Sequence, residues 1–336
     1  MIPIFLACDE NYVKYAAVTI SSIISNTNSE ISFYILDGGI EEESKSNLSS
    51  ILCNTKHSLE FISVNINLFK DFPYIKHFSL NTYSRFLIPD LKPELEKALY
   101  IDTDMVVCGD IAEIYNKQFE GKGIAVVAYM DEDCDPKLYS KYKKRLNIQN
   151  EHRYFNAGLL LIDCEYWRKH NIVKQLMEKT FLLKDIIEMP DQDILNIVFE
   201  SNYRELEPQY NLVVDLTARY QNFNQYISNI SGCYILHYTG GQGIRPWINK
   251  SVPGANCFWK YAKLTPFYKD LVVDLSLNQT ENLHKKIDLI FPGNFVSVIR
   301  LFNVFPIIKV KYKSNRKKVY LFGFIPLYTI SRRSNA

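Results

Sequence analysis

The sequence predicts an α/β fold with an open, mostly parallel sheet flanked by helices. Two short apolar runs, at residues 2–7 and 31–36, enclose a helical pattern at residues 12–24, which is the arrangement of a strand–helix–strand unit. Helical patterns also separate most of the further strand candidates, which are residues 59–64, 98–101, 124–128 and 159–162. Such alternation is typical of a parallel sheet with helices on its faces.

The rest of the chain divides near residue 270. Helical periodicity covers residues 165–183 and 191–199, and the last strand candidate is residues 234–238. A chain of 336 residues suits one large domain with an appendage, and its composition changes only near residue 270. We therefore expect a large domain at residues 1–269 and a small extension at residues 270–336.

The extension is basic and aromatic. Residues 289–336 contain nine Lys or Arg and no Asp or Glu, whereas residues 1–288 carry a formal net charge of −7. Such asymmetry indicates an anionic partner, which is a lipid surface or a nucleic acid. No known nucleic-acid-binding motif accompanies the basic segment, so we expect an anionic membrane surface and no nucleic acid. The apolar stretch at residues 289–310 contains prolines and Arg300, which makes it a poor membrane-spanning helix.

Cysteine usage and the first residues predict a cytoplasmic protein. The seven cysteines are scattered and form no Cys-x-x-Cys pair, which is typical of reduced residues used in packing. The apolar start lacks a basic leader, and Asp9 and Glu10 interrupt it too early for a secretory signal. Together with the basic extension, this predicts peripheral association with the inner face of the cytoplasmic membrane.

Paired carboxylates end one predicted strand. The apolar run at residues 98–101 is followed by Asp102, Thr103 and Asp104, and this spacing places both carboxylates on one side of an extended chain. Ligands of open α/β sheets bind beyond the carboxyl ends of the strands. Hard oxygen atoms at that place suit Mg²⁺ or Mn²⁺ bridging the protein and substrate phosphates. The alternative is a solvated turn that contains two acids.

A histidine and a glycine-rich loop supply further ligands. His237 closes the strand candidate at residues 234–238, and Gly240 begins a Gly-Gly-Gln-Gly loop soon after it. Imidazole beside two carboxylates favours Mn²⁺ over Mg²⁺, and glycines let backbone N–H groups approach phosphate oxygens. A hydrogen-bonded structural histidine followed by an ordinary turn is the alternative.

Polar residues after the first strand suit a nucleotide base. They offer carboxylate and amide groups for a uracil edge and an aromatic face for stacking. The alternative is that the acid at position 9 caps the helix that follows. The segment consists of Ala7, Cys8, Asp9, Glu10, Asn11 and Tyr12.

Other polar residues suit a diphosphate and a sugar. Arg85 supplies a cation that can meet phosphate, although a solvated arginine on a helix face is the commoner role. Asn156 and two small residues precede the strand candidate at residues 159–162, and acids that include Asp131 follow the one at residues 124–128. Asp191 and Gln192 open a helical pattern after a proline. Turns, caps and solvated loops are the alternatives. The sugar-binding candidates are Asn156, Ala157, Asp191, Gln192 and Asp131.

Six motifs taken in order resemble glycosyltransferase family 8. They are Ala-Cys-Asp-Glu-Asn-Tyr, Thr-Tyr-Ser-Arg, Tyr-Ile-Asp-Thr-Asp, Phe-Asn-Ala-Gly, Asp-Gln-Asp and His-Tyr-Thr-Gly, and the match spans roughly residues 2–250. Within that family, the motifs resemble those of bacterial lipopolysaccharide galactosyl- and glucosyltransferases. The resemblance implies a GT-A fold with residues 1–269 as its catalytic domain. It also implies a UDP-hexose donor, Mn²⁺ with Mg²⁺ as the alternative, and retention of the anomeric configuration.

The resemblance assigns roles to individual residues. Asp102, Asp104 and His237 would hold the metal, residues 8–12 would contact the uridine, and Gly240 would lie against the diphosphate. Ala7, Thr103 and Ala157 complete the predicted donor site. The donor hexose would be surrounded by Arg85, Asp131, Asn156, Asp191 and Gln192.

Catalysis is also implied by the resemblance. The position of the nucleophile in the family holds Gln192, a poor nucleophile. This favours a same-face displacement in which the leaving phosphate helps to deprotonate the acceptor hydroxyl and Gln192 stabilises an oxocarbenium-like state. Asp191 and Asp131 are alternative nucleophiles. Close relatives place a basic residue soon after the His-Tyr-x-Gly motif, and Arg245 is the candidate in this chain, although the loop before it is longer.

The extension at residues 270–336 resembles the carboxyl-terminal segment of the same lipopolysaccharide enzymes, above all at residues 317–327. We interpret it as a membrane-binding segment, because basic residues attract anionic lipid while Phe and Tyr settle at the interface. The alternative is a small subdomain whose aromatic residues pack on the large domain.

These observations predict a Mn²⁺-dependent, retaining hexosyltransferase that moves galactose or glucose from UDP to a lipopolysaccharide core or another surface glycan. One alternative is a non-catalytic carbohydrate-binding protein of the same fold. The other is a metal-dependent nucleotidyl- or phosphotransferase, which would need a phosphate loop or a basic phosphate-binding cluster that the sequence does not show.

Overall fold

The chain forms two compact units, Met1–Val272 and Val273–Ala336. The division falls within one long helix, shortly after the predicted change at residue 270. The computed structural model describes residues 1–74, 79–128, 136–214, 232–239, 245–290, 296–301, 305–313, 316–321 and 325–331.

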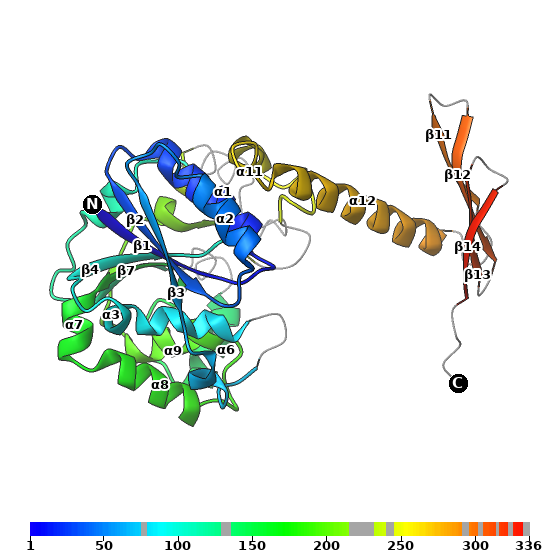
Figure 1. Ribbon diagram of the computed structural model, residues 1–336. Helices are drawn as coiled ribbons and strands as arrows, with labels where there is room; N and C mark the ends of the chain where they lie inside the picture. Colours follow the sequence, from blue (N-terminus) through cyan, green and yellow to red (C-terminus); the bar gives the residue numbers. More distant parts are fainter. Residues whose placement is uncertain are drawn as a thin grey trace. The chain divides into compact units, whose positions relative to one another are not determined.

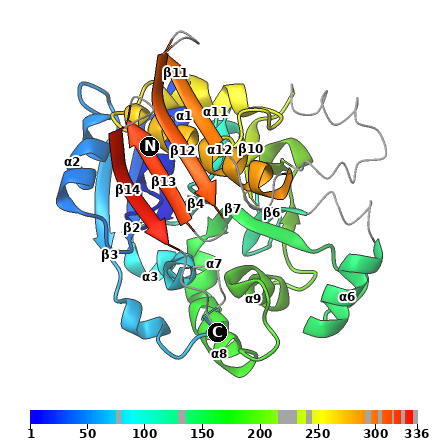
Figure 2. The ribbon, with the colours of Figure 1, turned by 90° about the vertical axis from the view of Figure 1, so that its right-hand side faces the viewer.

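The first unit is an α/β body with helices on both faces of its main sheet (Figures 1 and 2). The strands of that sheet are β1 (Ile2–Cys8), β2 (Ile31–Asp37), β3 (Ser58–Ser63), β4 (Lys97–Ile101), β6 (Ile124–Ala128), β7 (Phe155–Asp163) and β8 (Arg204–Glu205). They lie in the order β3-β2-β1-β4-β7-β6-β8.

The helices of the body include short 3-10 turns as well as α-helices. The α-helices are α1 (Val13–Asn26), α2 (Glu42–Ser50), α3 (Ile88–Leu91), α4 (Ala112–Tyr115), α6 (Pro136–Leu146), α7 (Cys164–Lys169), α8 (Ile172–Leu182), α9 (Pro190–Val198) and α11 (Ala255–Ala262). The 3-10 turns are η1 (Ile66–Phe69), η2 (Leu80–Leu87) and η3 (Pro208–Asn211).

Two hydrophobic clusters fill the two sides of the main sheet. In β1, Ile4 and Leu6 pack in the cluster on the side of α1 and α2, whereas Phe5 packs in the cluster on the side of α3, α7, α8 and α9. Alternate residues of β4 and β7 divide in the same way. Because both faces are buried, the central strands are continuous apolar runs in the sequence.

The prediction of an open, mostly parallel sheet is confirmed, with one reversed strand. β1 is parallel to β2 and β4, but β7 runs antiparallel to both β4 and β6. β7 therefore brings its first residues, rather than its last, to the edge where β1 and β4 end. This reversal places Asn156 and Ala157 beside the residues that follow β4.

One predicted helix is divided in two. Periodicity predicts a single helix at residues 165–183, whereas the structure has α7 and α8 with Asn171 between them at φ 52°. A left-handed backbone interrupts the helical ladder, and asparagine tolerates it better than most residues do. The prediction of one continuous helix is therefore wrong at this position.

A second, three-stranded sheet lies beside the main sheet. Its strands are β5 (Met105–Val107), β10 (Ile235–His237) and β9 (Leu212–Val213), in the order β5-β10-β9. β10 pairs antiparallel with β5 and parallel with β9. The sequence predicts β10 but neither β5 nor β9, because runs of two or three residues show no clear periodicity.

The second unit contains most of α12 (Tyr268–Ile290) and a separate antiparallel sheet. The strands are β11 (Val296–Leu301), β12 (Phe305–Lys313), β13 (Arg316–Leu321) and β14 (Ile325–Ser331), paired in chain order. The register places Lys311 opposite Lys318 and Lys313 opposite Arg316. Within the described parts of the chain, no helix combines the length and apolar character needed to cross a membrane.

Truncation of a central core residue tests the packing of the main sheet. Leu161 of β7 is 0% exposed, whereas Leu182 at the end of α8 is 72% exposed. We expect Leu161→Ala to reduce the free energy of unfolding by about 2–5 kcal/mol, because it leaves a cavity between packed layers. Leu182→Ala is the matched control and should change it by less than about 0.5 kcal/mol. Urea unfolding of both variants makes the comparison, and equal losses would contradict this description of the core.

Candidate active site

A cavity of about 690 Å³ opens where β1 and β4 end and β7 and α9 begin. Ligands of open α/β sheets bind at this edge. Twelve predicted site residues line the cavity. They are Ala7, Asp9, Tyr12, Arg85, Asp102, Thr103, Asp104, Asn156, Ala157, Asp191, Gln192 and Arg245.

Two carboxylates and an imidazole converge beside this cavity. Ligand atoms of Asp102, Asp104 and His237 all lie within 4.8 Å of one another. Nε2 of His237 is 3.1 Å from Oδ1 of Asp104 and 3.8 Å from Oδ2 of Asp102. This nitrogen is buried and makes no hydrogen bond with any residue that the structure describes. Two carboxylates and one unpaired imidazole nitrogen form a donor set that fits a divalent cation of the Mn²⁺ type.

Pairing of β10 with β5 brings the histidine to the carboxylates. His237 lies opposite Met105, the residue directly after Asp104. The N–H of Tyr238 donates to the carbonyl of Asp104 at 3.0 Å, which extends the pairing by one residue. The cluster is therefore assembled by backbone hydrogen bonds between two segments that lie far apart in the chain.

A polar stripe on α1 holds the other side of β5. Oγ1 of Thr19 lies 3.0 Å from the carbonyl oxygen of Thr103 and 2.7 Å from that of Met105. Ser22 accepts a hydrogen bond from the N–H of Val107, and Asn26 donates to its carbonyl. α1 thus takes the place of a neighbouring strand and fixes the backbone that carries both carboxylates.

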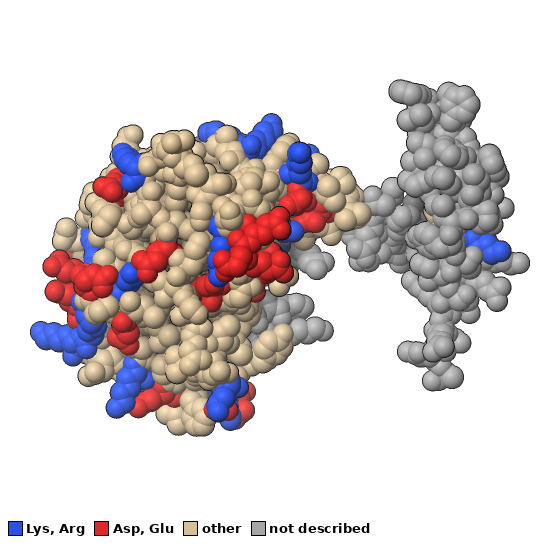
Figure 3. All heavy atoms as spheres, in the orientation of Figure 1, with Lys and Arg blue, Asp and Glu red and all other residues tan. Residues whose placement is uncertain are grey.

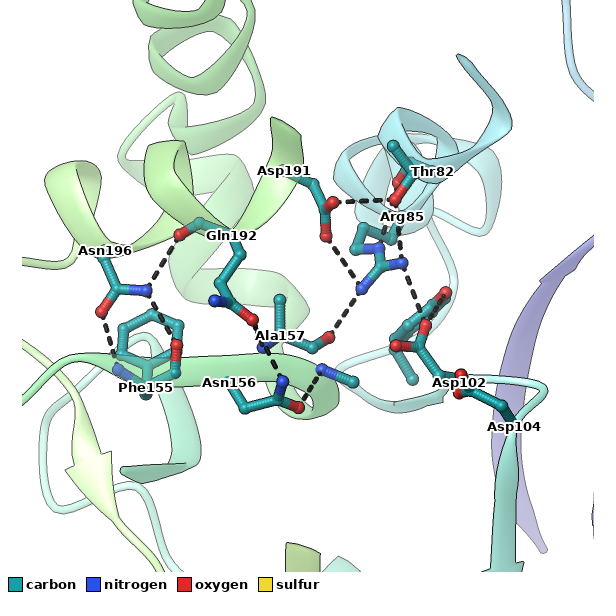
Figure 4. Close-up of polar contacts among 12 residues, drawn as sticks. Thr82, Arg85, Asp102, Asp104, Phe155, Asn156, Ala157, Asp191, Gln192 and Asn196 are labelled. Carbon is teal, nitrogen blue, oxygen red and sulfur yellow. Dashed lines mark hydrogen bonds and ion pairs between the residues drawn. The ribbon is translucent and has the colours of Figure 1, made fainter. Parts of the chain in front are cut away.

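Arg85 is buried at the centre of an ion-pair network (Figure 4). Its guanidinium group lies 3.0 Å from Oδ1 of Asp102 and 2.9 Å from Oδ2 of Asp191, and it donates to the carbonyl of Ala157 at 2.7 Å. The guanidinium group also lies 4.2 Å from the ring centre of Tyr100. Burial alone would lower the pKa of Arg85, but the two carboxylates outweigh it and raise the pKa. The network is therefore a fixed charged wall of the cavity.

Gln192 projects from the first turn of α9 toward the start of β7 (Figure 4). Its Oε1 accepts hydrogen bonds from Nδ2 of Asn156 and from the N–H of Ala157, both at 3.1 Å. Its Nε2 donates to the hydroxyl of Tyr154 at 3.3 Å. The side-chain oxygen is thus already held by two donors, which makes Gln192 an ordered polar group rather than a free nucleophile.

Arg245 contributes a second cation to the cavity. It donates to the hydroxyl of Tyr12 at 3.1 Å and lies 5.7 Å from the ring centre of Trp247. Burial acts to raise the pKa of Asp104, but His237 and Arg245 outweigh it, so that the pKa is lowered. Asp104 is therefore kept ionised, the form that could bind a cation.

The chain matches a known protein family over the residues that form this site. The model for glycosyl transferase family 8 matches residues 3–251, which include the main sheet, the cavity and the cluster of two aspartates and a histidine. The chain belongs to glycosyl transferase family 8. It is therefore a glycosyltransferase, and the body has the GT-A fold that the resemblance predicts.

Individual relatives cover most of this family 8 chain. General stress protein A of Bacillus subtilis (strain 168) is 27% identical over 270 residues, which are 76% of this chain and 91% of that protein. A lipopolysaccharide 1,2-glucosyltransferase of Escherichia coli is 25% identical over 298 residues, which are 86% of this chain and 85% of that protein. The crystal structure of the galactosyltransferase LgtC with donor and acceptor sugar analogues matches with a TM-score of 0.68 and 27% identity, covering 79% of this chain and 96% of that chain.

Cys8, Glu10 and Asn11, which are predicted to contact the uridine, are not among the described residues that line the cavity. Cys8 is buried in the core on the α1 side, Asn11 is exposed, and neither is among the residues that line the cavity. Glu10 accepts hydrogen bonds from the N–H of Glu41 and the hydroxyl of Ser44, and so attaches the loop after β1 to the start of α2. Asp9 accepts from the N–H of Tyr12, which is the capping role considered as its alternative. Asp131 and Gly240 lie outside the described residues.

Other site residues of the family 8 chain were not among the predictions. Thr82 donates to Asp191, and the hydroxyl of Tyr100 donates to Asp102, so both fix carboxylates that face the cavity. Gly158 packs directly against Asp102 and His237. The motifs Thr-Tyr-Ser-Arg and Phe-Asn-Ala-Gly contain Thr82 and Gly158 but do not indicate which of their members touch the site.

Gly158 offers a steric test of the cluster. A Cβ at this position would overlap Cε1 of His237 and Oδ2 of Asp102. We expect Gly158→Ala to push the side chains of Asp102 and His237 apart and to lower Mn²⁺ affinity about 10–100-fold, as loss of groups that orient ligands does. Gly123→Ala is the matched control, because its Cβ would overlap the ring of Tyr166 with similar severity, away from the cavity. Mn²⁺ titration of both variants, with thermal unfolding to verify folding, should show weakened binding only for Gly158→Ala, and equal affinities would refute this account.

Proposed function

We propose that this glycosyltransferase is a retaining hexosyltransferase that moves galactose or glucose from a UDP-sugar to a lipopolysaccharide core or another surface glycan, with Mn²⁺ as its metal. The observation that carries the proposal is the cluster of Asp102, Asp104 and His237 at the edge of a cavity with two arginines. A nucleoside diphosphate carries negative charge, and such a site offers it both a cation and guanidinium groups.

The cavity divides naturally between the parts of a UDP-hexose. Asp9 and Tyr12 lie near the end of β1, where an acid and an aromatic ring suit the uracil base. Arg245 suits the diphosphate. Asp191 and Asn156 lie on the other side of the carboxylate pair and suit the hydroxyl groups of the hexose.

The side-chain contacts favour a same-face displacement over a covalent intermediate. Both oxygens of Asp191 are occupied, one by Thr82 and one by Arg85, and Oε1 of Gln192 already accepts two hydrogen bonds. In this reaction the bond from C1 of the sugar to UDP breaks, and the acceptor oxygen bonds to C1 on the same face. The acceptor proton passes to an oxygen of the leaving phosphate. When bound, a divalent cation supplies Lewis-acid stabilisation of the leaving diphosphate.

The family 8 relatives support this choice of donor and acceptor. One is named a lipopolysaccharide 1,2-glucosyltransferase, and another is a galactosyltransferase crystallised with donor and acceptor sugar analogues. The proposal leaves glucose and galactose as the two donors, because one epimeric hydroxyl group distinguishes them.

We also propose that the second unit binds an anionic membrane surface on the cytoplasmic side. On the face of the body in Figure 3, acidic and basic side chains lie close together, whereas residues 289–336 contain nine Lys or Arg and no acid. Lys318 is exposed, and the register places it opposite Lys311 in the neighbouring strand. Each Lys or Arg near an anionic surface contributes about 1 kcal/mol to binding.

Release of UDP tests the proposed reaction. We expect release from UDP-galactose or UDP-glucose to require Mn²⁺, and to fall about a hundredfold or more in Asp104→Ala, because the variant loses charge stabilisation at the departing phosphate. Asp185→Ala changes an exposed aspartate that follows α8 and is not among the residues lining the cavity, and it is the matched control. Release without Mn²⁺, or unchanged release in Asp104→Ala, would reject a metal-dependent transferase.

Binding to vesicles tests the proposed membrane surface. We expect the full-length variant with Lys309→Glu, Lys311→Glu and Lys318→Glu to lose binding to phosphatidylserine vesicles, because three attractive charges become repulsive. The same charge change at the exposed residues Lys137, Lys141 and Lys144 of α6 should leave binding intact. Co-flotation measures both variants, and equal binding would show that the second unit does not supply the membrane contact.

A further inference from the structure

A chain of amide side chains connects the predicted metal ligand to the start of β7. Nδ1 of His237 lies 3.0 Å from Oδ1 of Asn211, a buried residue at the end of η3. Nδ2 of Asn211 donates to Oδ1 of Asn156 at 2.9 Å, and Nδ2 of Asn156 donates to Oε1 of Gln192 at 3.1 Å. All four side chains are buried. These hydrogen bonds therefore connect β10, η3, β7 and α9. Each of the buried polar groups bonds to a neighbouring side chain instead of to water.

Two backbone N–H groups determine the direction of every hydrogen bond among these four side chains. The N–H of Gly158 can only donate, so the Asn156 atom that it meets at 2.9 Å is the side-chain oxygen. The N–H of Ala157 likewise identifies the oxygen of Gln192. With the oxygen of Asn156 assigned, the Asn211 atom next to it must be the donating nitrogen.

The assignment extends from Asn211 to the imidazole. If Nδ2 of Asn211 faces Asn156, its Oδ1 faces His237 and can only accept. Nδ1 of the imidazole must then carry the proton, and in the neutral ring Nε2 has a lone pair. That lone pair points at Asp102 and Asp104, whose oxygens are also acceptors. Three acceptors facing one point require a cation or a proton between them.

We propose that Asn211 is a positioning residue that keeps the proton of His237 on Nδ1 and so presents Nε2 to the metal. The metal half of this inference rests on the proposed function, whereas the position of the proton does not. Without an acceptor at position 211, the tautomer with the proton on Nε2 is the more stable one, because Nε2–H can donate to Asp104. A metal would then have to displace that proton before it could bind.

The same hydrogen bonds determine the orientation of the Gln192 side chain. Because Asn156 receives the N–H of Gly158 and the amide of Asn211 on its oxygen, its nitrogen must point to Gln192. Asn211 thus orients a residue on each side, the imidazole at the predicted metal site and the amide at the sugar side of the cavity. The two predicted halves of the active site share one hydrogen-bond network.

The position of the imidazole proton is measured directly in the metal-free protein. Nitrogen-15 NMR with labelled histidine distinguishes the protonated ring nitrogen from the unprotonated one. In the parent protein, we expect the proton of His237 on Nδ1. In Asn211→Leu, a substitution of similar volume without an acceptor, we expect the proton on Nε2, and a proton that stays on Nδ1 would overturn the proposal.

A matched control distinguishes this effect from general loss of packing. Asn196 is equally buried and its amide oxygen lies 2.9 Å from Nε2 of His152, a histidine outside the predicted metal site. Asn196→Leu should therefore leave the signals of His237 unchanged. If Asn196→Leu shifted the proton of His237 as well, the effect would reflect disturbed packing, and the proposal would fail.

Metal affinity and a second variant complete the test. Mn²⁺ titration should show about 10–100-fold weaker binding in Asn211→Leu, the usual cost of losing a group that orients a metal ligand. Asn211→Asp keeps an acceptor for Nδ1 but loses the donor to Asn156. We expect it to retain the proton on Nδ1 and the affinity for Mn²⁺, while kcat falls through the disturbed Gln192. A proton on Nε2 in Asn211→Asp would contradict the role assigned to the acceptor.

Failure of this inference and failure of the proposed function give different results. If the parent protein binds no Mn²⁺ but its His237 proton moves from Nδ1 to Nε2 in Asn211→Leu, the proposed metal is wrong and Asn211 still sets the imidazole. If the parent binds Mn²⁺ and Asn211→Leu binds it equally well, the metal stands and the positioning role of Asn211 is rejected.

Discussion

The antiparallel pairing of β5 with β10 is the interaction on which the active site depends. It brings His237 opposite Met105, one residue after Asp104, although the two strands are far apart in the chain. β5 has only three residues and would be a weak strand by itself. Its second edge is therefore satisfied by Thr19, Ser22 and Asn26 of α1. A short strand held on both edges positions carboxylates more firmly than a surface loop could.

Burying several charges at one place is costly, and the structure offsets this cost by pairing. Arg85 lies between Asp102 and Asp191, and its remaining contacts are the carbonyl of Ala157, Thr82 and the ring of Tyr100. The cluster of Asp102, Asp104 and His237 is the exception, because Nε2 of the histidine stays without a hydrogen bond among the described residues. Complete pairing on one side of Asp102 and an unpaired imidazole nitrogen on the other fit a candidate site for a divalent cation.

Some residues of the site can be predicted from the sequence, whereas others are recognised only from their contacts in the structure. The Asp-Thr-Asp motif predicts two candidate metal ligands, because the chemistry and spacing of its carboxylates are local properties. Asn211 follows Pro-Gln-Tyr and has no such pattern, so only its contacts with His237 and Asn156 reveal it. Gly158 belongs to a recognised motif, yet only the packing of Asp102 and His237 against it explains why a side chain would not fit there.

The sequence by itself determined the α/β class, the order of most strands and helices, the carboxylate pair and the relation to family 8. These follow from periodicity and from short motifs, in which the relevant residues are neighbours in the chain. Only the tertiary structure decided the reversed direction of β7, the attachment of Glu10 to the start of α2, the burial of Arg85 and the hydrogen bonds that connect His237 to Gln192. Such features arise between segments whose separation in sequence carries no information about distance, because strand pairing and side-chain packing bring them together only when the chain folds.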